Sequence, residues 1–252
     1  MPVPSGEHDG ITGVVFRSGG HRLIGTLYLA RGDEPKPTAL LLHGCPGLEQ
    51  NADIAVALRD RGWNSLIFHY RGCWGSEGRY DLLTIPSDVA AAVDHLQAGG
   101  YPGVDQARFA AVGHSLGGWA AILAAAADAR LRAVAVYGAA IGLGAIDLTA
   151  AEIDHEMTRF LTTTPEEFLR QREEAVARLD PLGAVAAIAP RPLLIMHGTD
   201  DRWVPPEQAR SLYAHARGPC RYAEIEGANH DFAWHRAELR ELVTSWLTEA
   251  DV

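Results

Sequence analysis

The chain has 252 residues, of which 47% are hydrophobic and 21% charged, a composition typical of a globular domain rather than of a disordered or fibrous chain. Its formal net charge of −10 repels a phosphate backbone, so we expect no nucleic-acid partner. No apolar stretch approaches the roughly 20 residues of a transmembrane helix, and residues 1–10 show no secretory signal, so we expect a cytoplasmic protein that binds no membrane. The three cysteines show no metal-ligand spacing and are too few for a disulfide framework.

Short apolar runs alternate along the chain with segments whose apolar residues recur at helical spacing. The runs predict strands at 14–17, 23–29, 39–42, 65–68, 109–112, 133–137, 193–196 and 221–225. The helical segments lie at 51–61, 87–98, 116–127, 208–215 and 237–246. We expect the first two strands to form a hairpin through Gly19 and Gly20, and Ser87 to cap the second helix. The repeated order predicts an α/β fold with a mostly parallel central sheet and helices on both faces.

One long segment interrupts this order. More than 50 residues separate the strands predicted at 133–137 and 193–196, whereas a plain crossover needs far fewer. The segment has its own helical pattern on either side of the sequence T-T-T-P at 162–165, which breaks it in two. We interpret residues 139–190 as a small helical cap inserted above the sheet of a single domain that spans residues 1–252. The alternative is an elongated crossover helix packed on the flank of the sheet.

The residues G-H-S-L-G at 113–117 match the pattern G-x-S-x-G. They directly follow a predicted strand and open a predicted helix, which is the context that this nucleophile elbow requires. In so tight a turn the serine takes a strained backbone conformation, and small neighbours let adjacent segments approach. The hydroxyl is then presented at a helix N-terminus, whose dipole favours negative charge. We therefore interpret Ser115 as a nucleophile.

A serine nucleophile needs a base, and the base needs an acid that orients it. Two downstream segments supply candidates: H-G-T-D-D-R-W-V-P at 197–205 and G-A-N-H-D-F at 227–232. Each follows a predicted strand, and the carboxyl ends of parallel strands meet at the edge of the sheet where ligands bind. The chain order nucleophile, acid, base is fulfilled by Ser115, an aspartate of the first segment, and His230.

With these segments the chain resembles the α/β-hydrolase superfamily, near the cinnamoyl-esterase and dienelactone-hydrolase-like groups. The last part is also similar to the catalytic domain of prolyl-oligopeptidase-type serine peptidases, which often show H-G-x-x-D-x-x-V-P around the acid. Alignment on that pattern implies Asp201 as the catalytic acid, with Asp200 as the alternative. The pattern G-A-x-H implies His230 as the base, with His235 as the lesser candidate. Dienelactone hydrolases proper carry cysteine at the elbow, so Ser115 argues against that particular chemistry.

The residues H-G-C-P-G at 43–47 resemble the H-G-x-x-G oxyanion loop of the same superfamily. The resemblance implies that the backbone amide of Cys45 is one donor of an oxyanion hole. The amide of Leu116, just after the nucleophile, is the other. Cys45 departs from the residues that are usual there, but only its amide is needed. Cys45 as a nucleophile is disfavoured, because the elbow belongs to Ser115.

Several histidines fall at or just after predicted strand ends, namely His43, His69, His114 and His197. Together with Asp201 and His230 they could suggest a metal site, but the sequence lacks the pair of histidines at i and i+4 of a helix that is typical of a zinc protease. We expect these histidines to hold loops by hydrogen bonds beneath the site. The chain is therefore expected to need no metal and no cofactor.

The residues Y-R-G-C-W-G-S-E-G at 70–78 resemble a loop of the superfamily, R-G-x-G-x-S-x-G, whose usual role is structural. Trp74 in this loop replaces a smaller residue and is predicted to line the substrate pocket. Weaker pocket candidates, for which core packing is the alternative, are Trp119, Phe160, Trp203 and Trp234.

These observations predict a serine hydrolase that cleaves a carboxylic ester of modest size through an acyl-enzyme. The alternatives are a short-peptide serine peptidase, an acyltransferase or cyclase of a biosynthetic pathway, and a non-catalytic binding protein on the same fold. Only about 38 residues precede the first buried strand, so we do not expect the large N-terminal propeller of prolyl oligopeptidases. The expected partner is a small-molecule substrate, and a homodimer stays open.

Overall fold

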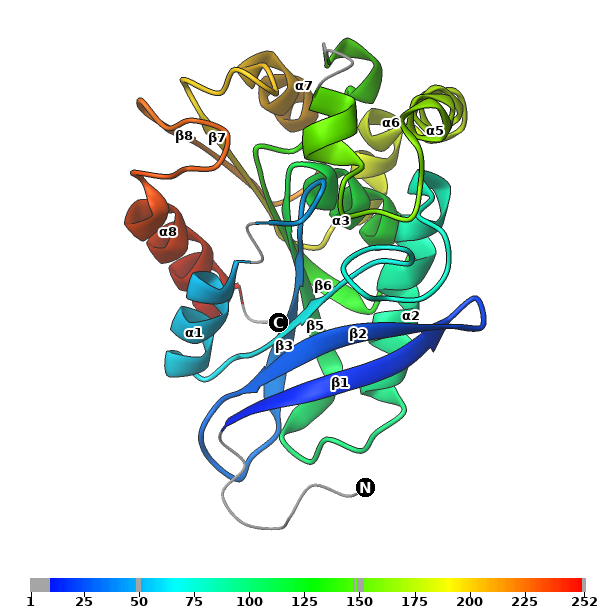
Figure 1. The fold of residues 1–252 in the computed structure, drawn as a ribbon. Helices are drawn as coiled ribbons and strands as arrows, with labels where there is room; N and C mark the ends of the chain where they lie inside the picture. Colours follow the sequence, from blue (N-terminus) through cyan, green and yellow to red (C-terminus); the bar gives the residue numbers. More distant parts are fainter. Residues whose placement is uncertain (1–9, 49–50, 147, 149–151, 251–252) are drawn as a thin grey trace.

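The computed structural model describes residues 10–48, 51–146, 148 and 152–250, and the N-terminal residues on which the expected lack of a signal rests lie outside these ranges. Its centre is an eight-stranded sheet with the order β1-β2-β4-β3-β5-β6-β7-β8 (Figure 1). The strands are β1 (Gly10–Ser18), β2 (His21–Leu29), β3 (Lys36–Leu42), β4 (Asn64–Phe68), β5 (Val104–His114), β6 (Leu131–Tyr137), β7 (Leu193–Gly198) and β8 (Cys220–Ile225). β1 and β2 form the expected antiparallel hairpin, β2 also pairs antiparallel with β4, and the other neighbours are parallel.

The unbroken apolar runs of the central strands serve two hydrophobic cores at once. In β3, Leu40 and Leu42 belong to the core on one face of the sheet, whereas Ala39 and Leu41 belong to the core on the other. Because successive side chains of a strand point to opposite faces, a strand that is covered on both faces carries apolar residues at successive positions. The mostly parallel sheet with helices on both faces is thereby confirmed.

The helices divide between these two cores (Figure 1). α2 and α3 pack against each other on one face, and α1 and α8 pack against each other on the opposite face. The α-helices are α1 (Ala52–Asp60), α2 (Ile85–Gln97), α3 (Leu116–Ala127), α5 (Pro165–Arg178), α6 (Pro181–Val185), α7 (Pro206–His215) and α8 (Arg236–Glu249). Among the residues that the structure describes, no helix is both long and apolar enough to cross a lipid bilayer.

The predicted cap of Ser87 is wrong. α2 begins two residues earlier, at Ile85, directly after the short 3-10 turn η1 (Leu82–Thr84). The Ser87 hydroxyl donates to the carbonyl of Thr84, so this residue lies within the first turn of the helix. The side chain that accepts a backbone amide at this corner is Asp81, which accepts from Leu83 at 3.0 Å.

The segment between β6 and β7 has two parts that pack differently. The first part holds η2 (Leu143–Ala145), η3 (Ile153–Met157) and α5, and α5 contacts η2, η3 and η1. The second part holds α6 and η4 (Ala186–Ile188), which contact α3 on the flank of the sheet. The break expected at 162–165 is present, because the Thr164 hydroxyl accepts from the amide of Glu167 and caps α5.

One cation holds the first part of this segment together. The guanidinium of Arg172 on α5 donates to the carbonyl oxygens of Leu143, Gly144 and Ile146, at 2.8, 3.3 and 2.5 Å. The neighbouring Gln171 is buried and donates to the carbonyl of Tyr80 at 2.8 Å, which ties α5 to the loop that follows β4. The path of this segment is therefore fixed mainly through main-chain acceptors.

A buried ion pair fastens the loop after β4 to α2. The Nε atom of Arg71 donates to Oδ1 of Asp88 at 2.6 Å, and the backbone amide of Arg71 donates to Oδ2 at 2.9 Å. The side chain of Asp88 is fully buried and that of Arg71 is 14% exposed. Because both carboxylate oxygens are used, loss of the negative charge would leave a buried guanidinium without its counterion.

We therefore expect the substitution Asp88→Asn to lower the free energy of unfolding by about 3 kcal/mol, measured by urea denaturation. The matched control is Glu241→Gln, which removes the carboxylate of an ion pair with Arg61 whose acidic side chain is 63% exposed. An exposed pair contributes only about 0–1 kcal/mol. Equal losses in the two variants would contradict a special role for the buried pair.

Candidate active site

The tightest turn of the sheet carries Ser115, between the end of β5 and the start of α3. Its backbone angles are φ 52° and ψ −119°, a conformation that L residues rarely adopt. Two flanking glycines make the turn sterically feasible. A Cβ on Gly113 would overlap the backbone of Gly117, and a Cβ on Gly117 would overlap the carbonyl of Leu42 on the neighbouring strand β3. The strained strand–turn–helix geometry expected from the motif is therefore present.

The structure brings Ser115, His230 and Asp201 together at the carboxyl edge of the sheet. The hydroxyl Oγ of Ser115 lies 3.0 Å from Nε2 of His230, and Nδ1 of His230 lies 2.7 Å from Oδ2 of Asp201. A carboxylate oxygen accepts, so Nδ1 of the neutral ring carries the proton. Nε2 is then left with its lone pair facing the hydroxyl, which is the arrangement in which an imidazole can take the hydroxyl proton.

The carboxyl group of Asp201 is fixed from all sides. Its Oδ1 accepts the backbone amides of Trp203 and Val204, each at 2.9 Å, and Nε2 of His197 lies 3.3 Å from Oδ2. Burial acts to raise the pKa of Asp201, but the hydrogen bonds of His197 and His230, the electrostatic interaction with His230 and the amide of Val204 outweigh it and hold that pKa well below its usual range. Asp201 is therefore a carboxylate.

The alternatives to Asp201 and His230 lie elsewhere. The side chain of Asp200 belongs to an exposed residue, and its amide donates to the carbonyl of Ala228 at 3.0 Å. His235 lies at the N-terminal end of α8 rather than inside it. Neither approaches the hydroxyl of Ser115 in any recorded contact among the described residues.

Two further histidines position this group, and sequence reasoning expected only that they hold loops. His114 donates from Nε2 to the carbonyl of His230 at 2.9 Å, and its ring stacks on Tyr137 at 4.9 Å between centroids. His197 donates from Nε2 to the carbonyl of Val204 at 2.9 Å, which holds the turn that presents Asp201. Their positions at the ends of strands indicate that both histidines lie near the site. A position at a strand end does not show which backbone carbonyl the side chain binds.

A cavity of about 650 Å³ opens onto Ser115 and His230. Its wall is mostly apolar, and more than a third of the wall comes from the segment between β6 and β7. The residues of that segment in the wall are Ala140, Leu143, Ile146, Leu148, Met157, Arg159, Phe160, Phe168 and Arg172. Cys45 and Leu48 of the loop after β3 also line the cavity. A bound molecule would thus lie between this segment and the edge of the sheet.

The two expected oxyanion donors, the amides of Cys45 and Leu116, belong to residues that line this cavity beside Ser115. Leu116 is the first residue of α3, and an amide in the first turn of a helix has no acceptor within that helix. Cys45 follows β3 in the loop that faces the elbow, and its thiol lies 3.7 Å from the carbonyl of Met157. The placement suits donors that converge on an oxygen next to Ser115.

Only some of the aromatic residues that are candidates for the pocket line the cavity. Phe160 and Trp203 line the cavity. Trp74 does not, because it stacks behind Phe160 at 4.4 Å between centroids and donates from Nε1 to the carbonyl of Pro46. Trp119 does not either, because it is only 1% exposed and packs in the core on α3. Trp234 is 93% exposed and is not part of the wall.

Among the described residues, one group offers three atoms with metal-ligand chemistry in reach of one another: His43, His69 and Cys73. None of the three lines the cavity. The histidine next to Ser115 is instead engaged with Asp201, and no other such group lies around the hydroxyl in the described part of the chain.

Comparison with known proteins identifies the family of this chain. A profile of the prolyl oligopeptidase family matches residues 52–250. An uncharacterized protein of Mycobacterium tuberculosis, Rv2307c, is 30% identical over 234 residues, which cover 91% of this chain and 76% of that protein. The family match begins after the loop of Cys45, so that loop is placed by the structure rather than by the family.

Solved structures show the same fold. The esterase domain of a Rhodothermus marinus protein has a TM-score of 0.70 and 25% identity, covering 95% of this chain and 98% of that chain. A puromycin-hydrolyzing peptidase of Mycobacterium tuberculosis has a TM-score of 0.74 and 22% identity, covering 95% of this chain and 40% of that chain. The chain is therefore a hydrolase of the α/β-hydrolase fold, and it belongs to the prolyl oligopeptidase family.

Proposed function

We propose that this chain is a serine hydrolase that cleaves carboxylic esters of modest size by means of Ser115, His230 and Asp201. The observation that carries the proposal is the continuous chain of contacts from hydroxyl to imidazole to buried carboxylate, at 3.0 and 2.7 Å, beside an apolar cavity. A non-catalytic binding protein would have no need to keep a strained serine against an oriented imidazole.

The proposed reaction has two steps. His230 takes the proton of Ser115 as Oγ attacks the ester carbonyl, and the amides of Cys45 and Leu116 receive the negative charge on the carbonyl oxygen. The imidazolium, stabilised by Asp201, then gives the proton to the departing alcohol, which leaves an acyl group on Oγ. A water molecule, deprotonated by His230 in turn, attacks this ester, and His230 returns the proton to Oγ as the acid is released.

The cavity supports an ester with hydrocarbon groups rather than an extended substrate. Its apolar wall desolvates a hydrocarbon group well, and about 650 Å³ is the size of a small-molecule site. We propose that residues 139–190 form a cap for this site, because the first part of that segment supplies Met157, Phe160 and Phe168 to the wall. α6 at its end packs on the flank, so only part of the segment covers the cavity.

A second candidate is a peptidase that cleaves short peptides. It is favoured by the family to which the chain belongs, and the proposed triad is equally able to attack an amide. The two functions differ in the leaving group, because an amine needs protonation before it departs whereas an alcohol leaves more easily.

The first prediction is that a fluorophosphonate probe labels the wild-type chain on Ser115 and does not label the variant Ser115→Ala. The phosphorus is attacked only by an activated hydroxyl, so labelling reports the nucleophile without knowledge of the substrate. Peptide mass spectrometry locates the label, and circular dichroism shows that both chains are folded. Absence of label on the folded wild type would refute the proposed nucleophile.

A matched pair of variants tests the acid. Asp201→Asn should lower kcat for p-nitrophenyl acetate by about 10³–10⁴-fold, because an amide at this place no longer holds the proton on Nδ1 of His230. Asp200→Asn changes the adjacent, exposed residue and should leave kcat unchanged. The opposite ranking of the two variants would assign the role to Asp200.

A substrate panel separates the two candidate functions. We expect cleavage of p-nitrophenyl and hydroxycinnamate esters but no cleavage of short peptide amides above the blank, since the apolar cavity offers few partners for a peptide backbone. Ser115→Ala serves as the blank for every substrate. Faster cleavage of the peptides would favour the peptidase.

A further inference from the structure

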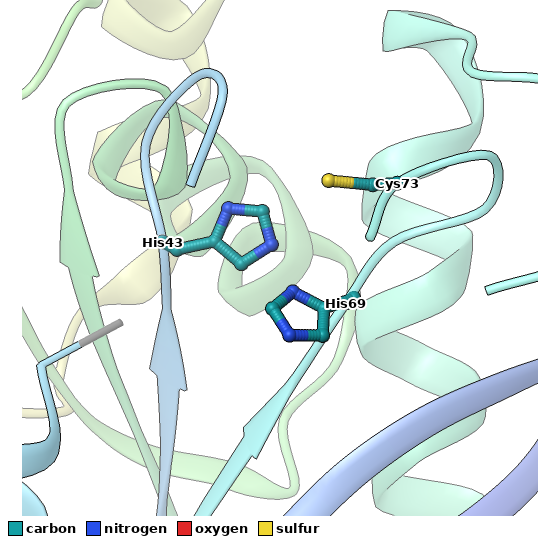
Figure 2. Close-up of side chains that lie close together, drawn as sticks. All are labelled: His43, His69 and Cys73. Atoms are coloured by element: carbon teal, nitrogen blue, oxygen red, sulfur yellow. The ribbon is translucent and has the colours of Figure 1, made fainter. Parts of the chain in front are cut away.

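Figure 2 shows a cluster of three side chains, His43, His69 and Cys73. None of the three lines the substrate cavity. His43 directly follows β3 and His69 directly follows β4. These two strands are parallel neighbours with Leu41 opposite Ile67, so two residues further on the two histidines stand side by side. Their ring centroids are 5.3 Å apart. The turn after β4 then brings Cys73 back over them, and one donor atom from each residue lies within 4.8 Å of the others.

The proton of His43 is placed by its backbone. Its Nδ1 lies 2.7 Å from the carbonyl oxygen of Gly44, which can only accept, so Nδ1 carries the hydrogen in the neutral ring. Nε2 is then the nitrogen with the lone pair, and Figure 2 shows the outer nitrogen of this ring turned toward the space below the Cys73 sulfur. An imidazole whose other nitrogen donates to a backbone carbonyl is the arrangement that metal-bound histidines commonly have.

His69 contributes a buried ring nitrogen to the cluster. Its Nδ1 is buried and has no hydrogen-bond partner among the residues that the structure describes. A buried polar atom without a partner is uncommon and asks for an explanation. Figure 2 shows the upper nitrogen of this ring turned toward His43 and Cys73.

We propose that His43 Nε2, His69 Nδ1 and the sulfur of Cys73 form a site for a zinc ion. Two imidazoles and one thiolate are ligands that zinc prefers, and water can complete the tetrahedron. The Cys73 thiol loses its proton to solvent as the zinc–sulfur bond forms. Ligand bonds of about 2.0–2.3 Å bring tetrahedral donors to about 3.5 Å from one another, so the three side chains close by roughly 1 Å on binding.

The site would act on structure rather than on the ester. His43 continues into Gly44 and Cys45, the loop proposed to hold an oxyanion amide, and Cys73 lies in the loop that Arg71 and Asp88 anchor to α2. A zinc ion would therefore cross-link two loops at the carboxyl edge of the sheet. Its ligands do not line the cavity, so the ion has no direct contact with the substrate.

The first test uses cobalt as a probe of the thiolate. The full chain, freed of metal with a chelator, is titrated with Co²⁺, whose bond to sulfur gives a charge-transfer absorption band in the near ultraviolet. We expect a band that saturates at one equivalent in the wild type and is lost in Cys73→Ser. The matched control is Cys220→Ser, which removes a half-buried cysteine on β8 and should keep the band.

The second test measures zinc itself. Competition with a chromophoric chelator gives the Kd for Zn²⁺, which we expect to rise about tenfold or more in Cys73→Ser and in His69→Gln. Saturating Zn²⁺ should raise the Tm of the wild type and of Cys220→Ser, and not that of the two ligand variants. Circular dichroism without metal shows whether each variant is folded. If Cys73→Ser does not fold, His69→Gln decides the question.

A simple packed cluster is the other outcome. In that case the thiol keeps its long contact of 3.6 Å to the carbonyl of Pro46, and the two rings pack against each other without a shared ion. The wild type would then show no cobalt band and no zinc-dependent Tm, or would bind zinc with the same Kd as both ligand variants. Either result overturns the proposal, and neither bears on labelling of Ser115 by the fluorophosphonate probe.

Discussion

The site rests on one steric constraint, the close crossing of backbones beneath Ser115. The carbonyl of Leu42 on β3 and the start of α3 approach so closely that a Cβ at Gly117 would overlap the former. This closeness lets the helix begin directly at the strand end and places the Leu116 amide next to the nucleophile. The cost is backbone strain at Ser115, whose φ is positive. Two hydrogen bonds hold this conformation: the amide of Ser115 donates to the carbonyl of Tyr137, and the amide of Ala140 donates to the carbonyl of Ser115.

The second organising feature is the shared edge at which the parallel strands end. Ser115, Asp201 and His230 come from positions up to 115 residues apart, yet they follow β5, β7 and β8 and so emerge at one edge. The sheet therefore brings residues that are distant in sequence close together in space. In the same way His43 and His69 come together after β3 and β4, at the edge where these parallel strands end.

Much of this could be predicted from the sequence, because the deciding signals are local. The strands and helices follow from apolar runs and their spacing. The neighbours of Ser115 show the elbow, since only small residues permit it. The choice of Asp201 over Asp200 came from a resemblance, and the structure gives its physical counterpart: two backbone amides and the His230 ring converge on Asp201 alone. That role stays a proposal until the variants are measured.

The rest depends on three-dimensional detail that no local pattern carries. Trp119 was a pocket candidate and packs in the core, because an aromatic residue on a helix gives the same pattern whichever way the helix is turned. Trp74 stacks behind Phe160 instead of lining the cavity, since the loop turns its ring away. Ser87 looked like a cap because the preceding 3-10 turn could not be told from a loop. The carbonyls that His114 and His197 reach are set by the register of distant strands.

The guanidinium of Arg172 has a consequence for how this protein can diversify. It grips the carbonyls of Leu143, Gly144 and Ile146, and a carbonyl is present whatever side chain its residue bears. The side chains of Leu143 and Ile146 meanwhile face the cavity. Mutation can therefore exchange these two wall residues, and with them the shape that selects a ligand, while the loop keeps its course. Because this anchor binds only main-chain oxygens, the specificity of the cavity can change in evolution while the fold of the loop is kept.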